Sequence, residues 1–174
     1  MGLGEIGTEV ARLADAFGME VLATRRDVSV RPPYVKELFA PERLHEMLAR
    51  CDAVVIATAH TPETAGLFDA RAFDSMKKGT FLVNVSRGGV VDEVALEAAL
   101  RDGHLAGAAF DVFAQEPLPA DSALWEVPNL LVSAHEAVGM PDYSAASFAR
   151  FSENFERYCR GEPLLGRVDP SKGY

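Results

Sequence analysis

The stretch TFLVNVSRGGVVDEVALEAALRDGHLAGAAFDV, residues 80–112, contains a complete strand–turn–helix–strand unit. The apolar run 80–85 predicts a buried strand, and the turn SRGG (86–89) follows it. Asp92 and Glu93 place negative charge where the dipole of a starting helix favours it, and Gly103 follows the end of that helix. The apolar run 106–112 predicts a second strand. Two strands joined by a crossover helix are typical of a parallel sheet.

The same alternation continues on both sides of this unit. Val10, Leu13, Ala14 and Phe17 recur at helical spacing before Gly18, and the polar, proline-marked segment 25–35 is typical of a loop. We therefore expect an α/β fold with a doubly wound, mostly parallel sheet of the Rossmann type. The further predicted elements are helices over about 41–50, 69–76 and 141–159, and strands over 20–24, 53–58 and 130–134.

Composition narrows the class of protein. The 174 residues are 48% hydrophobic and 25% charged, with a net charge of −9 and no block of Lys or Arg, which argues against nucleic-acid binding. Apolar runs fall short of the roughly 18–20 residues that span a bilayer, and the N-terminus lacks the pattern of a signal peptide. Cys51 and Cys159 lie far apart, so we expect free thiols and no metal site. Together, these features predict a cytoplasmic protein that acts on a small molecule.

The segment GLGEIG places Gly2, Gly4 and Gly7 in the G-x-G-x-x-G pattern of dinucleotide-binding loops. In that interpretation Gly2 allows a tight turn, Gly4 lets the backbone approach a pyrophosphate, and Gly7 lets the following helix pack closely on the sheet. The pattern carries this meaning only after a strand, and here a single methionine precedes it. The alternative is an N-terminus that contains glycines by chance.

The end of the second expected strand bears on the choice of cofactor. NAD sites usually have an acidic residue about twenty residues after the glycine loop, to bind the ribose hydroxyls. This chain has Thr24, Arg25 and Arg26 there. Arginine can clamp a 2′-phosphate with two hydrogen bonds, so we favour NADP, with NAD possible. The alternative is a pair of solvated surface arginines.

The run LVNVSRGGVVDEVALEAALRDGHLAGAAFDVFAQEPLP, together with TPETAGL and the terminal GEPLLGRVDPSKGY, closely resembles the D-isomer-specific 2-hydroxyacid dehydrogenase family. That family includes glyoxylate/hydroxypyruvate reductases and 3-phosphoglycerate dehydrogenases. By position, the resemblance implies that Arg87 binds the substrate, that Glu116 is the family's glutamate, and that His135 is its proton donor. Two positions depart from the family pattern: Ala134 stands where proline is usual, and Gly139 comes one place late.

The resemblance also implies which residues contact the dinucleotide, in addition to the three glycines. They lie in the loops that follow the expected strands, where ligands bind in such sheets. The implied contacts are Glu5, Ile6, Thr24, Arg25, Arg26, Thr58, Ala59, Thr64, Val85, Ser86, Asp111 and His135.

The three implied catalytic residues suit the reduction of a 2-oxo acid. The planar fork of Arg87 can grip a carboxylate and polarise the carbonyl, and His135 titrates near neutrality, so it can give or take a proton. Glu116 bonded to the other ring nitrogen should raise the pKa of the histidine. Each residue also has a structural alternative: a turn arginine, an exposed loop carboxylate, or a strand-end histidine satisfied by backbone. His60, in the loop after a strand, is a further candidate for the cleft.

The start of the chain affects the expected function. Members of the family carry a substrate domain before the glycine loop and a strand at the centre of the sheet, and neither precedes Gly2 here. We expect residues 1–160 to form a dinucleotide-binding domain without its first strand, and residues 161–174 to be a tail that completes the missing substrate domain. A fragment, a gene read from a late start codon, a non-catalytic relic and a strand supplied by another chain remain open.

The expected function is an oxidoreductase that transfers hydride between NADP(H), or NAD(H), and a small 2-hydroxy or 2-oxo acid. The chain would supply the cofactor site and the catalytic residues, and activity of these 174 residues alone is doubtful. The resemblance also implies a homodimer. The alternative is a non-catalytic dinucleotide-binding or scaffold module.

Overall fold

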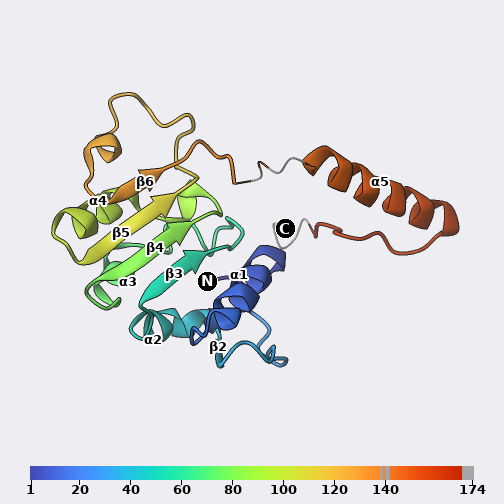
Figure 1. Ribbon diagram of the computed structural model, residues 1–174, viewed down its shortest axis with the longest axis horizontal. Coiled ribbons are helices and arrows are strands. Elements are labelled where there is room, and N and C mark those ends of the chain that lie inside the picture. The colour runs from blue at the N-terminus through green and yellow to red at the C-terminus, as the bar shows by residue number, and fades with distance from the viewer. Residues whose placement is uncertain (138, 140–141, 170–174) are drawn as a thin grey trace. The chain divides into compact units, whose positions relative to one another are not determined.

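The computed structural model describes residues 1–137, 139 and 142–169. The chain divides into two compact units, Met1–Ala134 and His135–Tyr174. The first unit is α/β, and all of its strand pairs are parallel (Figure 1). The expected Rossmann-like class is therefore confirmed.

A four-stranded sheet forms the larger part of the first unit. Its strands lie in the order β3-β4-β5-β6. Apolar residues alternate between its two faces, as in Val54 and Ile56, which are buried on one side, and Ala53, which is exposed on the other. The strands span β3 Ala53–Ile56, β4 Thr80–Asn84, β5 Leu105–Phe110 and β6 Leu130–Val132, at the positions that the apolar runs predict.

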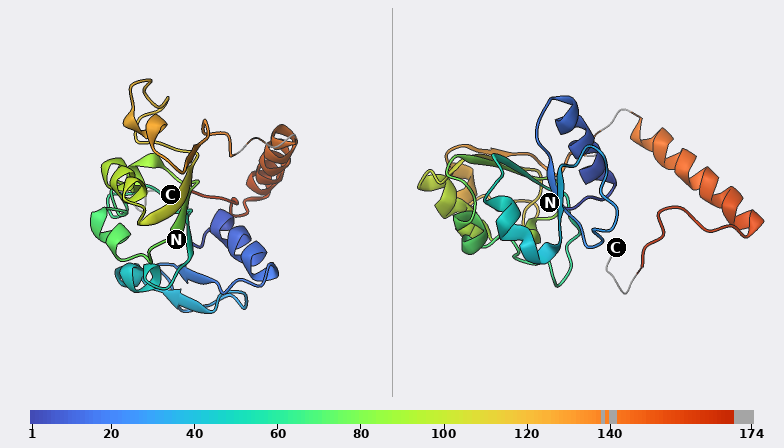
Figure 2. Two further views of the ribbon diagram at one scale, coloured as in Figure 1. Left: turned by 60° about the vertical axis from the view of Figure 1, so that its left-hand side comes forward. Right: turned by 90° about the horizontal axis from the view of Figure 1, so that it is seen from below.

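Three short helices cover one side of this sheet (Figure 2). They pack apolar residues against the buried face of the strands in a single core that includes Leu48, Phe73, Leu82, Leu96 and Phe110. The helices are α2 Leu44–Leu48, α3 Ala70–Asp74 and α4 Glu93–Arg101, and 3-10 turns span Pro41–Arg43, Gly88–Val90 and Ala123–Glu126. The expected helices after Pro41, Asp69 and Asp92 are thus confirmed, although the first begins as a 3-10 turn.

The remaining strands form a separate two-stranded sheet, in which β1 (Leu22–Thr24) pairs with β2 (Glu37–Phe39). The sequence did not predict β2, which directly follows the polar loop and has only one buried residue, Phe39. Helix α1 (Glu5–Ala16) lies on the side of the first unit opposite to α2, α3 and α4 (Figure 2). Its Ala11 packs with Leu3, Ala23 and Val35. Helices on both sides make the fold doubly wound.

The second unit contains helix α5, Tyr143–Arg160. It ends at Gly161, whose φ of 69° turns the chain back, and the side chain of Asn154 then exchanges hydrogen bonds of 2.8 and 3.1 Å with the backbone of Leu165. Phe148, Phe151 and Phe155 form an exposed row along α5. Residue 141, where the sequence placed the start of this helix, and residues 170–174 of the expected tail lie outside the described residues. None of the described helices is long and apolar enough to cross a bilayer.

Candidate active site

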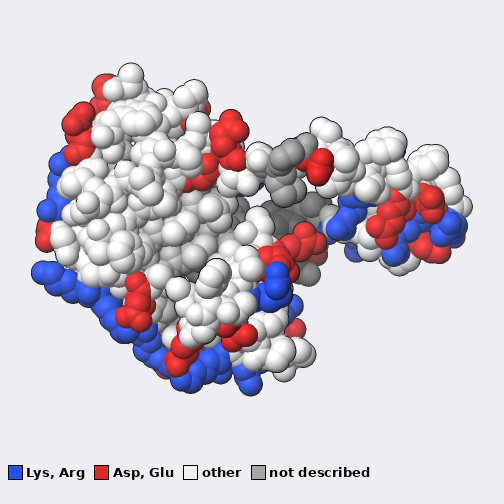
Figure 3. Space-filling view, viewed as in Figure 1, with Lys and Arg blue, Asp and Glu red and all other residues white. Residues whose placement is uncertain are grey.

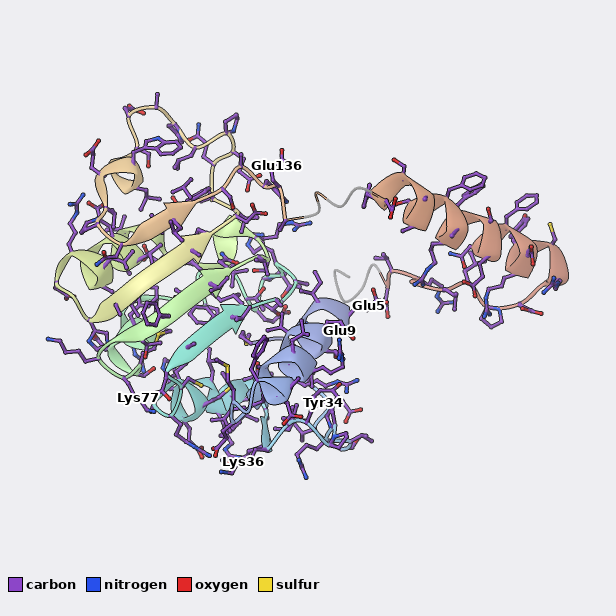
Figure 4. All side chains as sticks on the ribbon, viewed as in Figure 1. Glu5, Glu9, Tyr34, Lys36, Lys77 and Glu136 are labelled. Atoms are coloured by element: carbon purple, nitrogen blue, oxygen red, sulfur yellow. The ribbon has the colours of Figure 1, made fainter. Side chains whose placement is uncertain are left out.

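The loops that carry the predicted site residues follow the carboxyl ends of the parallel strands. Because all strands in a sheet point the same way, these loops gather at one edge, which is where α/β folds bind ligands. Figure 4 shows Glu5, at the start of α1, well apart from Lys77, which precedes β4 at the amino edge. The loops of the predicted site therefore lie at the edge where α1 begins.

The glycine loop is built from close backbone contacts. Gly2 has a φ of +83°, and a Cβ there would lie 2.6 Å from the carbonyl oxygen of Ala57. A Cβ on Gly7 would lie 1.9 Å from the carbonyl oxygen of Gly2, so the helix can only approach the loop because Gly7 has no side chain. A Cβ on Gly4 would meet nothing within 4 Å. Two glycines are therefore required by packing, and the third leaves open space.

The N-terminus of α1 is left without a side-chain cap. Gly4 is the N-cap residue and offers no side chain, whereas Asp69 and Asp92 cap α3 and α4 through their carboxylates. Free N–H groups and the positive end of the helix dipole suit the binding of a phosphate. Glu5 and Ile6, two predicted cofactor contacts, are exposed in the first turn beside this open end.

The end of β1 contributes one buried and two exposed residues. Thr24 is buried, and its hydroxyl accepts a 3.3 Å hydrogen bond from the backbone N–H of Gly2, so it holds the glycine loop. Arg25 and Arg26 are exposed. The pKa of Glu63 is lowered mainly by a hydrogen bond from Thr61, with a smaller contribution from the charge of Arg26. Arg26 therefore lies near the loop after β3.

The loop after β3 contains the predicted contacts Thr58, Ala59 and Thr64. The hydroxyl of Thr64 donates to the carbonyl oxygen of Ala59 at 2.7 Å and accepts from the backbone N–H of Thr61 at 2.8 Å. Thr58 and Ala59 are half-buried next to the Gly2 turn, since the Cα of Thr58 would lie 3.0 Å from a Cβ on Gly2. This loop and the glycine loop are thus neighbours.

The turn after β4 is organised by Asn84, a residue that the sequence reasoning missed. Its fully buried amide oxygen accepts from the backbone N–H and the hydroxyl of Ser86 at 3.0 and 2.7 Å, and its nitrogen donates to the carbonyl oxygen of Arg87 at 3.2 Å. Val85 is half-buried and donates its N–H to Ile56. The sequence did carry a signal for Asn84, because it is a polar residue inside the otherwise apolar run LVNV. The Arg87 side chain is exposed, and its guanidinium donates to the Ser86 carbonyl oxygen at 2.7 Å.

Glycine contacts bring three of these loops together. A Cβ on Gly88 would lie 1.8 Å from the carbonyl carbon of Phe113, in the loop that carries Glu116. A Cβ on Gly89 would lie 2.7 Å from Cε1 of His60, in the loop after β3. The turn that carries Arg87 therefore touches both neighbouring loops, and His60 lies against it.

The loop after β5 is held by two carboxylates. Oε1 of Glu116, itself exposed, accepts from the backbone N–H of Phe113 at 3.0 Å, and Oε1 of Glu93 accepts from the N–H of Ala114 at 2.6 Å. Glu93 was predicted only as a helix-start residue. At the end of β5, the buried Asp111 accepts a 2.6 Å hydrogen bond from the hydroxyl of Ser133. This contact ties the end of β5 to the segment after β6.

The structure brings the loops of Arg87 and Glu116 together, and it leaves His135 as a prediction. His135 directly follows Ala134, the last residue of the first unit, and is itself the first residue of the second. Its side chain is exposed, and its φ of 57° lies in the left-handed region that favours glycine. Such backbone is more common at functional loops than elsewhere.

A glycine loop, an uncapped helix and two converging strand-end loops are the arrangement of a dinucleotide-binding domain. Residues 1–137 match the family model described as D-isomer specific 2-hydroxyacid dehydrogenase, NAD binding domain. The chain belongs to this family. The resemblance noted in the sequence is thereby confirmed.

Relatives and solved structures agree with this membership. Glyoxylate/hydroxypyruvate reductase A of Salmonella newport is 33% identical over 174 residues, which are 100% of this chain and 55% of the reductase. The D-isomer specific 2-hydroxyacid dehydrogenase of Xanthobacter autotrophicus Py2, solved with NADPH and MES, is 40% identical with a TM-score of 0.90, covering 99% of this chain and 70% of that one.

An NADPH-dependent glyoxylate/hydroxypyruvate reductase of Sinorhizobium meliloti, solved with NADP and sulfate, is 32% identical with a TM-score of 0.91. The match covers 100% of this chain and 55% of that structure. The chain therefore spans about half the length of the reductases it matches.

Proposed function

We propose that the chain is the cofactor-binding and catalytic-residue portion of an oxidoreductase that acts on a small 2-hydroxy or 2-oxo acid. The contact of the Arg87 turn with the loops of His60 and Glu116 carries this proposal, because it brings together the loops that bear a cation and a carboxylate at the edge where α1 begins uncapped. Family membership supports the same reaction class.

The residues divide the chemistry among them. NADPH, when bound, supplies the hydride that reduces the carbonyl carbon. Arg87 binds the substrate carboxylate and polarises the carbonyl, because its exposed guanidinium can form two parallel hydrogen bonds. His135 donates a proton to the carbonyl oxygen as it becomes a hydroxyl, and Glu116 bonds the other ring nitrogen and favours the protonated imidazole.

We favour NADP over NAD as the cofactor. Arg25 and Arg26 are exposed at the end of β1, where a 2′-phosphate would lie, and the solved relatives from Xanthobacter and Sinorhizobium hold NADPH and NADP. Fluorescence titration of the 174-residue chain tests this. We expect tighter binding of NADPH than of NADH, and we expect Arg25→Ala with Arg26→Ala to remove the preference. Arg12→Ala, which removes an exposed arginine paired with Glu9 on α1, should leave it unchanged.

Turnover tests the catalytic half of the proposal. NADPH consumption is followed with glyoxylate or hydroxypyruvate, in a chain extended to the length of its relatives. His135→Ala and Arg87→Ala should each reduce the rate sharply, whereas His45→Ala, which removes an exposed histidine on α2, should not. If NADPH binds and no 2-oxo acid is reduced, the chain is a non-catalytic dinucleotide-binding module instead.

We also propose a homodimer built on the face of the four-stranded sheet opposite α2, α3 and α4. This face is apolar, and Phe81 and Leu131 are 57% and 73% exposed on it. Light scattering tests the assignment. Leu131→Glu should produce monomers, whereas Val94→Glu, at a residue 78% exposed on α4 across the sheet, should not.

The domain assignment remains our proposal. Residues 1–160 would form the dinucleotide-binding domain, and residues 161–174 would complete a substrate domain. Limited proteolysis in the presence of NADPH should protect the first segment more than the second.

We also propose that the protein is cytoplasmic. The free thiols of Cys51 and Cys159 support a reducing compartment such as the cytoplasm.

A further inference from the structure

Asp111 lies at the carboxyl end of β5, with its carboxylate largely removed from solvent. The residue is 6% exposed, and its backbone N–H donates to the carbonyl oxygen of Asn84 at 3.1 Å, which ties the end of β5 to the end of β4. An ionised carboxylate that leaves water needs hydrogen-bond donors, because desolvation disfavours its charge. The resemblance in the sequence implies that Asp111 contacts the dinucleotide, so a donor to its carboxylate can affect how the cofactor is held.

Ser133 is such a donor, and the sequence did not single it out. Its hydroxyl donates to Oδ1 of Asp111 at 2.6 Å, and its backbone N–H donates to the carbonyl oxygen of Phe110 at 3.0 Å. The backbone bond extends the pairing of β5 with β6 by one residue beyond Val132. The main chain of Ser133 is therefore fixed on β5, and its hydroxyl holds the carboxylate from a defined side.

The order of the strand ends places Asp111 at the nicotinamide half of the proposed cofactor site. The 2′-phosphate would lie by Arg25 and Arg26 after β1, and the pyrophosphate at the open end of α1, beside the loop after β3. Next in the larger sheet come β4 and β5, so a dinucleotide that extends along this edge would reach Asp111 with its nicotinamide half. Figure 3 shows basic side chains along the lower edge of the first unit, around α2 and β2, and an uncharged surface over the strands of the larger sheet. This distribution suits a phosphorylated half near β1 and an uncharged ring near β5.

The chemistry of the two groups is complementary. An ionised carboxylate only accepts hydrogen bonds, whereas the carboxamide of a nicotinamide ring carries two N–H donors on its nitrogen. Asp111 can accept from that nitrogen only if its carboxylate is turned toward the ring. The hydrogen bond from Ser133 to Oδ1 restricts the rotation of the carboxylate, so it also restricts how the carboxamide and its ring can lie.

We propose that Ser133 is a positioning residue for the nicotinamide half of the cofactor: its hydroxyl holds the Asp111 carboxylate in the orientation that accepts an N–H of the carboxamide. This inference rests on the proposed cofactor function of the chain. Ser133 acts through Asp111 and touches neither the ring nor the substrate. The alternative is a hydroxyl that only satisfies a buried carboxylate, and that role would not distinguish one half of the cofactor from the other.

Isothermal titration calorimetry of the 174-residue chain separates the two halves of the cofactor. The ligands are NADPH and 2′-phospho-ADP-ribose, which keeps the 2′-phosphate, the adenosine and the pyrophosphate but has no nicotinamide. Ser133→Ala should weaken NADPH about tenfold, through the loss of one hydrogen bond to a charged group, and should leave 2′-phospho-ADP-ribose within about twofold of its wild-type affinity. Ser133→Thr keeps the hydroxyl and should recover most of the NADPH affinity. Ser75→Ala, which removes a hydroxyl bonded to the Ala72 carbonyl oxygen after α3, should change neither affinity.

A double-mutant cycle tests whether Ser133 acts through Asp111. Asp111→Ala should weaken NADPH at least as much as Ser133→Ala does, and adding Ser133→Ala to it should cause no further loss. Retained binding of 2′-phospho-ADP-ribose shows that each variant is folded.

Several outcomes would overturn the proposal. One is a pair of losses that multiply in the double variant, and another is a Ser133→Ala chain that binds both ligands as the wild type does, or binds both more weakly by the same factor. Equal affinity of the wild-type chain for the two ligands would also overturn it, while the dinucleotide function would stand. A wild-type chain that binds neither ligand would contradict the proposed cofactor function, and this inference would fail with it.

Discussion

The two sheets of the first unit differ in what holds them together. The β3–β6 sheet has three consecutive parallel pairings and a continuous core supplied by α2, α3 and α4. The β1–β2 sheet has one pairing of three residues and a small cluster built around Leu3, Ala11, Ala23 and Val35. Parallel strands are normally buried on both faces and paired on both edges, so the smaller sheet is the weaker part of the fold.

The largest expected effect comes from the core of the larger sheet. Leu82 in β4 is fully buried, so Leu82→Ala should lower the free energy of unfolding by about 2–5 kcal/mol. Val35 is equally buried, but it packs in the smaller cluster. Val35→Ala should therefore act mainly on local opening of β1 and β2, with less than about 1 kcal/mol on the global transition.

Hydrogen exchange and urea unfolding on the same variants distinguish the two cases. Amides of β4 should exchange only through global unfolding, and amides of β2 should exchange faster in the wild-type chain and faster still in Val35→Ala. A single transition to which both substitutions contribute in proportion to the apolar volume removed would show that the sheets unfold as one body.

The same contrast explains which features the sequence revealed. Long apolar runs such as 80–85 and 106–112 predicted strands of the larger sheet, because parallel strands are normally buried on both faces and therefore carry nearly continuous apolar sequence. The strand Glu37–Phe39 was missed because a three-residue strand with one buried side chain has no periodicity to detect. Glu93 was missed for another reason: it holds the N–H of Ala114, 21 residues away, which only the folded chain brings near it. Asn84 bonds groups of its own turn, and its place as a polar residue in an apolar run was a signal that could have found it.

The sequence likewise predicted some features of the site and left others to the structure. The motifs located the loops of Arg87 and Glu116, and the structure shows that these loops touch through Gly88 and Phe113. Spacing alone could not show this contact, since it depends on the order of the strands. Thr24 is buried and accepts a hydrogen bond from Gly2, and its contact with the cofactor stays a prediction. A side chain that follows a strand can face either the ligand or the loop, and the sequence does not distinguish the two.

The second prediction concerns the amino terminus of the chain and how the free energy of unfolding depends on pH. The α-amino group of Met1 has an ordinary pKa of 8.0 and a folded pKa of about 6. The unfolded chain therefore binds more protons between these values, and the free energy of unfolding should rise as the pH rises from 6 to 8. The difference corresponds to about 3 kcal/mol, fully present above pH 8 and lost below pH 6.

Acetylation of the amino terminus provides the control for this prediction. An acetylated Met1 cannot be protonated but keeps an N–H that can donate to Val55, so its pH dependence over this range should be smaller by the contribution of the amine. The two chains differ only at the amino group, so the contributions of all other groups cancel in the difference. Identical slopes in the two chains would show that the amino group is solvated.

A smaller effect is expected at the capped helix of the larger sheet. Asp92 accepts hydrogen bonds from the N–H groups of Val94 and Ala95 at 2.9 and 3.1 Å. Asp92→Ala should lower the free energy of unfolding by about 1 kcal/mol, measured by thermal or urea denaturation. Asp92→Asn, which keeps the acceptor oxygen, should recover most of the loss. An unchanged midpoint for the alanine variant would mean that α4 is stabilised by packing alone.

The smallest effect on stability is expected at the uncapped helix, where function should change most. Gly4 begins α1 with open space around it, so Gly4→Ser can supply the cap that α1 lacks and should stabilise the fold by only a few tenths of a kcal/mol. The serine hydroxyl would then occupy the N–H groups that a phosphate requires, and NADPH affinity should fall at least tenfold.

Gly4→Ala separates these two contributions, because a methyl group adds bulk without a cap. If alanine weakens NADPH as much as serine does, close backbone approach is what Gly4 provides. If serine alone weakens it, the free N–H groups are decisive. Unchanged NADPH binding in both variants, with the fold intact, would mean that this helix end does not hold the pyrophosphate, and the contrast between a capped α4 and an open α1 would have no functional meaning.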